Sequence, residues 1–532
     1  MKKTAYHVLN AALALLMIQG SLFISSCADE LDTEQNGVIS TSSFYQTDTD
    51  CEEAMTDVYA TFQSYNTNYT GTCWYMKTLL SDEVVTGGSS RSDVPEAVEL
   101  NEYQYDYSNT CINAVFSLTY ELINRANLVI NNFDPEQSDI MCRNVAEAKV
   151  FRAMCNFELV TLWGTAPLVL EAVRDDYKSA NSTAEELWAQ IEEDLTDAIN
   201  SGALNEKTSI DDTTSGVRIT KQFAQALLGK AYLFQGNYSS AITMLQAVVN
   251  SGLYGFLDDY GNYCVATYNN NREVIFSDNN VNDTSIGDYH NFFPWVFINI
   301  HSNYTTGQEY NGNDYSFMGY GILNPSQGLV DAFLDNEPES DRFKESIKDY
   351  YDLMDMGITL IDGQEYYASC GYFNYKYRGA VSSRITGYYM AYYNNFVYMK
   401  YSEVVLLLAE ALIQTQGAGA GDTYINLIRD KAGVDQISGA TLEDLKLEKR
   451  LELYMDGVRY QDLIRWGDAA DAMAEQGKEI PAFLGLNDDG TFNVNTARYT
   501  NSSYGFKDKH KLLPFPQEEM EVNPNIVQNS GW

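Results

Sequence analysis

The pattern of apolar and polar positions along the chain is that of a protein built mainly from α-helices. From about residue 49 onward, apolar side chains recur with the helical period. The segment 145–164 carries a wide apolar stripe and stops at a glycine followed by Pro167, a common way for a helix to end. The segment 182–199 begins with two possible N-cap residues, Ser182 and Thr183, and two glutamates follow them as in a capping box. These segments predict long amphipathic helices.

Two further segments predict pairs of helices. In 227–249, two helical stretches are separated by the letters QGNY, and small residues occupy the positions where the helices must approach. Tyr232 and Tyr238 stand at the wedge positions, so the segment resembles a tetratricopeptide unit. The second pair spans 406–433 and is joined by GAGAG. That glycine run does not fit GxGxxG and follows no predicted strand, so we interpret it as a turn and not as a phosphate site.

The stretch 253–395 has a different character from the helical blocks on either side. It is rich in Tyr, Asn, Gly and Asp and poor in long helical periods. Short strands are predicted at 273–277 and 372–377. A long, loop-rich insert on a helical scaffold is a common place for a binding site.

The first 26 residues have the form of a secretory signal. Lys2 and Lys3 precede the apolar run 11–18, and small and polar residues lead to Cys27. The letters ISSC resemble the lipobox of bacterial lipoproteins, and the acidic residues behind the cysteine resemble the export signal of Bacteroidetes surface lipoproteins. We therefore expect acylation of Cys27, which would anchor the protein by two or more lipid chains.

Composition narrows the classes of ligand. The formal net charge of −40 argues against nucleic acid, which requires a basic surface. It argues less strongly against sulfated or uronic-acid-rich ligands, because a local basic pocket could override the mean field. Eight cysteines without a CxxC pair indicate neither a zinc site nor a disulfide framework. The most unusual feature of the composition is its 40 tyrosines. They suggest aromatic surfaces, although most aromatic side chains of a large chain lie in its core.

No catalytic or metal-binding motif is evident. The chain after Cys27 has three histidines and lacks HExxH, GxSxG and an EF-hand loop, so we assign no catalytic residue, metal or cofactor. A glycosidase needs only two suitably spaced carboxylates, and 74 acidic residues leave that alternative open. Within 459–468, Asp462 can reach Arg459 and Arg465 at helical spacing, which we interpret as a structural ion network. The charged stretch 335–349 is interpreted as a solvated helical face.

Five segments in order carry a family resemblance. They resemble motifs of the SusD/RagB family of surface lipoproteins, with Lys400, Asp456 and Tyr460 standing where Arg, Glu and Trp are usual. The segments are AEAKVFRA (146–153), GTAPLV (164–169), YMKYSEVVLLLAEAL (398–412), LEKRLELYMDGVRYQDLIRWGD (447–468) and LLPFPQEEMEVNPNIVQNSGW (512–532).

The resemblance implies a fold and a role. The expected fold is mainly α, SusD-like, with tetratricopeptide-like helix pairs and an irregular, loop-rich, ligand-binding segment. The expected role is to capture a neutral oligosaccharide or polysaccharide at the outer surface of the outer membrane, held by the lipid anchor, and to deliver it to a SusC-like TonB-dependent transporter. The expected organisation is a signal peptide (1–26), a tether (27–48), an N-terminal helical region (49–252), the insert (253–395) and a C-terminal SusD/RagB region (396–532). The alternatives are a lipoprotein glycoside hydrolase, and the same fold binding peptides or serving as a protein scaffold.

The expected ligand site consists of aromatic residues near helix breaks and in the insert. Sugar rings stack on aromatic planes while amide and carboxylate groups bond their hydroxyls. Trp163, Trp188 and Trp466 fall on helical stripes and are assigned to the core. The ligand-binding candidates are Trp74, Tyr75, Tyr289, Trp295, Tyr304, Tyr310 and Asn311.

Overall fold

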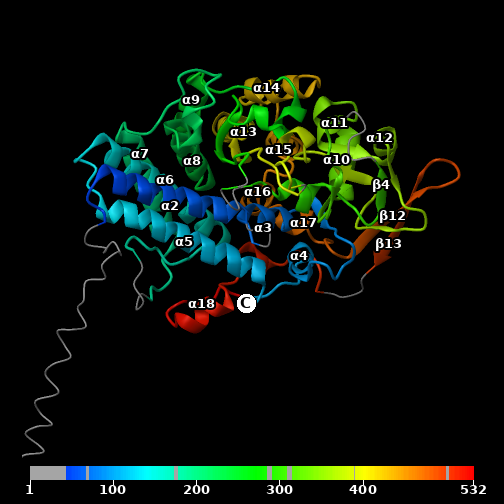
Figure 1. Cartoon of the computed structure of the whole chain (residues 1–532), viewed down its shortest axis with the longest axis horizontal. Helices are drawn as coiled ribbons and strands as arrows, with labels where there is room; N and C mark the ends of the chain where they lie inside the picture. The colour runs from blue at the N-terminus through cyan, green and yellow to red at the C-terminus, as the bar shows by residue number, and fades with distance from the viewer. Residues whose placement is uncertain are drawn as a thin grey trace, which may run out of the picture. The chain divides into compact units, whose positions relative to one another are not determined.

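The computed structural model describes residues 44–67, 71–172, 178–283, 285, 290–307, 314–388, 390–498 and 503–532. The chain divides into two units, residues 1–50 and 51–532. The expected signal segment and Cys27 lie outside the described residues. The second unit is mainly α-helical, which confirms the predicted fold class (Figure 1).

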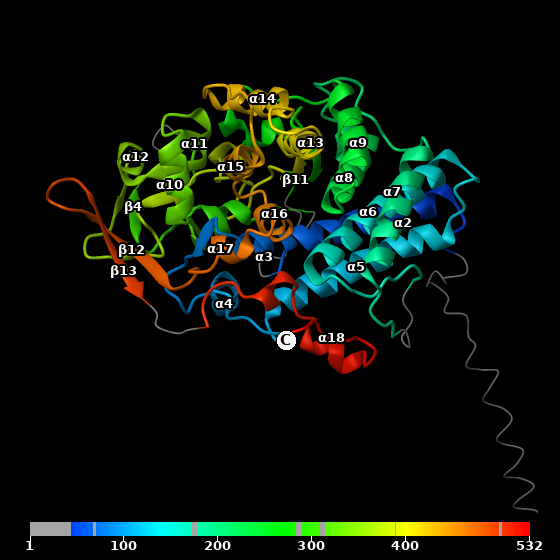
Figure 2. The same cartoon turned by 180° about the vertical axis from the view of Figure 1, so that it is seen from behind.

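Long helices form the N-terminal part of the second unit. Helix α5 (Thr110–Asn132) packs against α6 (Asp139–Trp163), and α6 packs against α7 (Ala184–Asn200). Figures 1 and 2 show these helices side by side with α2 (Asp48–Thr67). The side-chain oxygen of Thr183 accepts from the N–H of Glu186, whose carboxylate accepts from the N–H of Thr183, so the predicted capping box is confirmed.

Both predicted helix pairs are present. The four helices are α8 (Lys221–Phe234), α9 (Tyr238–Asn250), α13 (Tyr401–Gln416) and α14 (Asp422–Ala432). Helix α9 also packs against α13, which joins the two pairs. A Cβ atom on Gly229 would lie 2.7 Å from Cγ of Leu245, so the glycine permits the close approach of α8 and α9.

The remaining α-helices in the described part of the chain are short. They are α3 (Cys73–Leu79), α4 (Pro95–Asn101), α10 (Gln327–Asn336), α11 (Asp341–Ser346), α12 (Tyr350–Asp355), α15 (Leu442–Glu452), α16 (Arg459–Trp466), α17 (Ala469–Ala472) and α18 (Gln517–Val522).

Short strands in small sheets are spread along the insert. The predicted strands occur as β2 (Val274–Asp278), paired with β11 (Phe396–Lys400), and β10 (Tyr372–Asn374), paired with β7 (Ile347–Asp349). The other two-stranded sheets are β1 (Val84–Thr86) with β6 (Leu323–Pro325), β3 (Ile300–His301) with β5 (Met318–Gly319), and β4 (Thr305–Gly307) with β8 (Ile358–Leu360).

One hairpin was not predicted from the sequence. Strands β12 (Glu479–Leu486) and β13 (Phe492–Arg498) pair with each other, and β12 also pairs with β9 (Tyr366–Tyr367), giving the order β13-β12-β9. The hairpin, drawn in orange, projects at the end of the insert in both views (Figures 1 and 2). The C-terminal region therefore contributes a sheet to the insert.

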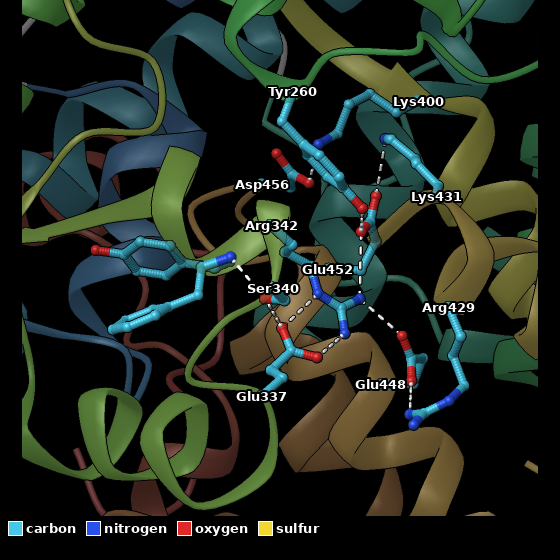
Figure 3. A network of polar contacts seen from close by, with 12 residues as sticks. Tyr260, Glu337, Ser340, Arg342, Lys400, Arg429, Lys431, Glu448, Glu452 and Asp456 are labelled. Carbon is cyan, nitrogen blue, oxygen red and sulfur yellow. Dashed lines mark hydrogen bonds and ion pairs between the residues drawn. The ribbon is translucent and has the colours of Figure 1, made fainter. Parts of the chain in front are cut away.

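A buried ion network joins the insert to the C-terminal helices (Figure 3). Arg342 is 1% exposed and forms ion pairs with Glu337 at 2.5 Å, Glu448 at 2.7 Å and Glu452 at 3.3 Å. Glu337 and Arg342 come from the insert, while both other glutamates lie on α15. The expectation of a solvated face at 335–349 is therefore wrong for these two residues. Glu337 pairs with Arg342, and Arg342 also pairs with the two glutamates of α15, so both charges are buried.

A second ion group surrounds α16. Asp462 is paired with Lys449 at 2.6 Å and with Arg465 at 2.8 Å. Arg459 contacts Asp82 at 2.8 Å instead of Asp462. The interpretation of this segment as a structural ion network is confirmed, with one arginine having a different partner from the expected one.

Tyrosine hydroxyls complete the hydrogen bonding of irregular backbone in the insert. The N–H of His301 donates to the hydroxyl oxygen of Tyr366 at 2.8 Å, and the N–H of Leu360 donates to Tyr350 at 3.1 Å. The rings of these tyrosines belong to a buried cluster with Ile300, Tyr304, Tyr315, Phe317, Leu353, Ile358, Phe373, Tyr375 and Phe483. Each such tyrosine buries apolar area and supplies a polar partner that regular secondary structure would otherwise provide.

None of the helices in the described part of the chain is both long enough and apolar enough to cross a membrane.

Candidate functional site

Trp74 and Tyr75 lie inside the protein. Trp74 is 8% exposed, and its Nε1–H donates to the carbonyl of Met455 at 2.7 Å. Its ring lies 5.0 Å from that of Phe293, and the ring of Tyr75 lies 4.4 Å from that of Phe297. The expectation of an exposed platform at Trp74 is wrong, because aromatic side chains of the insert cover it. Both residues connect α3 to the insert.

The space beside Trp74 is too small for a sugar. Two voids of about 20 Å³ each lie against its side chain. A void of this size holds about one water molecule.

Trp295 and Tyr304 are also buried but lie near the surface. Trp295 is 5% exposed and belongs to a π-helical turn, Pro294–Ile298. Tyr304 donates its hydroxyl hydrogen to the carbonyl of Ser89, which ties the insert to the loop before α4. Neither ring presents a full open face. The other three candidates, Tyr289, Tyr310 and Asn311, lie outside the described residues.

A groove of about 530 Å³ opens beside Tyr304. Its walls come from three separate parts of the chain: the loop before α4, the insert, and the β12–β13 hairpin. The lining residues are Ser89, Ser90, Tyr304, Glu365, Tyr367, Ile480, Pro481, Ala482, Asn495, Thr496 and Ala497. The lining combines tyrosine rings with hydroxyl, amide and carboxylate groups, the mixture expected of a polar–aromatic site.

A row of aromatic rings extends from the groove across the insert. The rings of Tyr304 and His301 are 5.2 Å apart, those of His301 and Tyr320 are 6.4 Å apart, and those of Tyr320 and Trp295 are 6.3 Å apart. Tyr320 is 48% exposed and is the open member of this row. The row therefore continues the aromatic lining of the groove onto the surface.

Sequence reasoning missed Tyr320, although a signal was present. The residue stands between two glycines, Gly319 and Gly321. A Cβ atom on Gly319 would lie 2.3 Å from the carbonyl oxygen of Trp295, and Gly321 has a φ of +54°. Both positions require glycine, and the tyrosine between them is exposed, with its ring edge-on to that of Trp295.

Carboxylates flank the buried end of this row. Burial, with Asp93 and Glu365 nearby, raises the pKa of Tyr304 to about 12. Burial also lowers the pKa of His301, with Asp93 acting in the opposite direction. Hydrogen bonds from Ser89 to Asp93 outweigh its partial burial and lower its pKa. The phenol of Tyr304 and the imidazole of His301 are therefore neutral at pH 7. Both lie near negatively charged carboxylates.

The described residues offer little for redox or metal chemistry. No three His, Cys, Asp or Glu side chains among them are grouped so that they could hold a metal ion. Cys73, Cys155, Cys264 and Cys370 are buried, and Cys142 is partly exposed. Burial raises the pKa of Cys73 to about 12 and of Cys370 to about 11, so these thiols are poor nucleophiles.

The structure thus combines a helical fold with a candidate surface site formed by the loop before α4, the irregular insert and a hairpin. The sequence model of the SusD family matches residues 258–532, and a second model, described as starch-binding and associating with the outer membrane, matches residues 31–233. The chain belongs to the SusD family, as the resemblance predicted.

Relatives and solved structures agree with this assignment. The SusD-like protein P25 of Formosa agariphila is 22% identical, over 95% of this chain and 96% of that protein. A laminarin-binding SusD-like protein is 25% identical, with a TM-score of 0.74 over 91% of this chain and 99% of its own. Surface glycan-binding protein A from Bacteroides thetaiotaomicron, solved in complex with laminarihexaose, is 20% identical and has a TM-score of 0.71 over 91% of this chain and 100% of its own. The last similarity concerns the fold alone.

Proposed function

We propose that this protein captures an uncharged oligosaccharide or polysaccharide at the cell surface and delivers it to a SusC-like TonB-dependent transporter. The observation that carries the proposal is the groove of about 530 Å³ beside Tyr304, together with the exposed ring of Tyr320. Membership of the SusD family and the glycan ligands named for two structural relatives support the same class of ligand.

The groove has the chemistry that a sugar chain requires. The rings of Tyr367 and Tyr320 offer surfaces for the C–H faces of sugars. Asn495 and Thr496 of the hairpin, and Ser90 of the loop before α4, offer donors and acceptors for hydroxyl groups in the same groove. We expect a Kd between about 1 μM and 1 mM, the range for a shallow and partly hydrated surface site.

A peptide is the alternative ligand, and the hairpin makes it less suitable. Peptides bind a sheet most readily by adding a strand to its edge. Strand β9 pairs with β12 at Ala482 and Phe483, and Pro481 lies next to this pairing. Proline has no N–H and cannot donate to an added strand. The wall of the groove therefore suits side-chain contacts to a glycan better than backbone contacts to a peptide.

Binding without catalysis is part of the proposal. Asp93 and Glu365 are carboxylates close to the groove, and a glycosidase acting there would need a protonated carboxylic acid. The pKa of Asp93 is lowered, which is opposite to the shift that such an acid requires. Incubation with a bound oligosaccharide, followed by chromatography, should return the ligand intact, and shorter products would overturn this part of the proposal.

Titration calorimetry of the lipid-free protein with laminarihexaose and with neutral polysaccharides tests the binding proposal. Tyr320→Ala and Asn495→Ala should each weaken binding about tenfold, since each removes a contact worth about 1–1.5 kcal/mol. Tyr107→Ala is the matched control, because Tyr107 is 44% exposed and does not line the groove. Failure of every neutral glycan to bind, or equal losses in all three variants, would contradict the assignment of the site.

Anchoring at Cys27 completes the proposal. Cys27→Ala should leave the protein unacylated and absent from the outer membrane, because acyl chains would supply the membrane affinity. Membrane fractionation and carbonate washing measure the result. Full retention of the variant in the washed membrane would contradict the anchor.

A further inference from the structure

The groove carries negative charge and lacks positive charge among its described lining residues. Glu365 is the charged member of the lining. Asp93 lies close to the same tyrosine, because Ser89 bonds to both: its carbonyl accepts from the hydroxyl of Tyr304, and its N–H donates to the carboxylate of Asp93 at 2.6 Å. A ligand lying against Tyr304 is therefore close to two carboxylates, of which Glu365 lines the groove.

The arginines closest to the groove in sequence have acidic partners. Arg91, next to Ser90 of the lining, bonds through both terminal nitrogens to the carboxylate of Glu102. Arg498, next to Ala497 of the lining, contacts Glu479 at 2.8 Å. Neither arginine brings uncompensated positive charge to the groove, and the net charge of −40 adds a negative background.

We propose that the groove discriminates between glycans by charge, accepting uncharged chains and rejecting chains with carboxylate or sulfate groups, and that Glu365 is the specificity-determining residue. This inference rests on the proposed function, because it assumes that the groove is where glycan binds. It goes beyond that function by naming the chemical class that the site excludes and the side chain that excludes it.

Glu365 would act in two ways. Its carboxylate accepts hydrogen bonds from sugar hydroxyls, and bonds to an ionised acceptor are stronger than bonds to a neutral one. The same carboxylate repels a uronate or sulfate placed at that position. Because the side chain is exposed, salt should weaken the repulsion, with a screening length of about 10 Å at 0.1 M and about 3 Å at 1 M.

The first experiment compares polysaccharides by affinity electrophoresis. The neutral set is laminarin, amylopectin, xyloglucan and galactomannan, and the anionic set is polygalacturonate, alginate and chondroitin sulfate. Retardation by a neutral polysaccharide alone supports the inference. Retardation by an anionic polysaccharide at low salt overturns it while leaving glycan binding intact. Retardation by none overturns the proposed function, and the inference falls with it.

The second experiment uses one matched pair of ligands. The best neutral oligosaccharide is compared with the same molecule after oxidation of its primary hydroxyls to carboxylates. The wild-type protein should bind the oxidised form at least tenfold more weakly, and this ratio should shrink in 1 M NaCl. Glu365→Gln should reduce the ratio about tenfold, mainly by improving binding of the oxidised form.

The control is Glu339→Gln, which removes a carboxylate that is strongly exposed and is not part of the groove lining. It should leave the ratio unchanged. An unchanged ratio in Glu365→Gln, or an equal change in both variants, would overturn the assignment of Glu365.

Discussion

The C-terminal helices and the insert bury their polar groups by different means. Around α15 and α16, charged side chains meet charged side chains: Lys449 lies between Asp462 at 2.6 Å and Glu410 at 3.7 Å, and all three are buried. In the insert, tyrosine hydroxyls meet backbone, as Tyr366 does with the N–H of His301. The first solution fixes regular helices against one another. The pairing of tyrosine hydroxyls with backbone groups allows the insert, which has little regular structure, to form a buried core.

The two solutions fail differently when one partner is removed. A buried charge that loses its partner costs much more than a lost neutral hydrogen bond, because the remaining ion is expensive to desolvate. Breaking the ion groups should therefore lower stability strongly, whereas changes on the aromatic surface of the insert should affect mainly binding. Four variants test this difference.

Arg342→Leu should have the largest effect. The change leaves three buried glutamates without their shared partner, and it should lower the free energy of unfolding by about 3–5 kcal/mol. Urea or thermal unfolding measures the loss. Lys344→Leu on the same helix is the control, since its exposed pair with Glu339 should contribute less than about 0.5 kcal/mol. Equal effects of the two variants would show that the ion network does not secure the insert.

Glu83→Gln should change the dependence of stability on pH. Burial raises the pKa of Glu83 to about 8, with Asp82 adding to the shift, so the folded protein holds this proton at neutral pH. In the unfolded chain, Glu83 loses this proton above about pH 4.5. Its contribution to the free energy of unfolding is therefore lost as pH rises from about 5 to 8.

The variant lacks that titration, so its stability relative to the wild type should improve by roughly 3–4 kcal/mol across this range. Denaturant unfolding at pH 5, 6, 7 and 8 measures the trend. A parallel pH profile for the two proteins would mean that Glu83 is already ionised in the fold.

Trp74→Phe should reduce stability by about 2 kcal/mol. The variant keeps a ring against Phe293 but loses the bond to the carbonyl of Met455 and part of the packed volume. Protein that remains folded should bind glycan as the wild type does. An unchanged melting temperature together with a loss of binding would show that Trp74 contacts the ligand.

Tyr320→Ala should have the smallest effect on stability, below about 0.5 kcal/mol, because half of the side chain is already exposed. Its effect on glycan affinity should nevertheless be about tenfold. Thermal unfolding and calorimetry should therefore show a loss of affinity with little change in stability for this variant, whereas Arg342→Leu should show a large loss of stability. A large drop in melting temperature would show that Tyr320 is part of the core.

The sequence predicted the helical part well because its signals are periodic or local. The capping box at Thr183 and Gly229 in the first helix pair each follow from spacing along one or two helices. The partners of Arg342 on α15 could not be predicted in this way, because Glu448 is 106 positions away and no periodicity links the two residues. The charge pattern at 335–349 by itself therefore predicts a solvated face, although Glu337 and Arg342 belong to a buried network.

The candidate site was predicted less well for a related reason. Whether an aromatic ring is covered depends on what folds over it, and the cover of Trp74 comes from Phe293 and Phe396, more than 200 positions away. Tyr304 is a predicted ligand-binding residue that lines the groove, whereas the hairpin that also lines the groove is not predicted from the sequence. The glycines on either side of Tyr320 were the local signal for an exposed ring.

The buried thiols provide built-in reporters of the order in which these regions open. Cys73 and Cys155 lie in the helical part, while Cys264 and Cys370 lie in the insert. Their burial suppresses reaction with alkylating reagents, so labelling of each site requires an opening that exposes it. Pulsed alkylation followed by peptide mass spectrometry would then give a separate opening rate for each region in the unmodified protein. If the insert opens as a unit of its own, Cys264 and Cys370 would be labelled together and before Cys73 and Cys155.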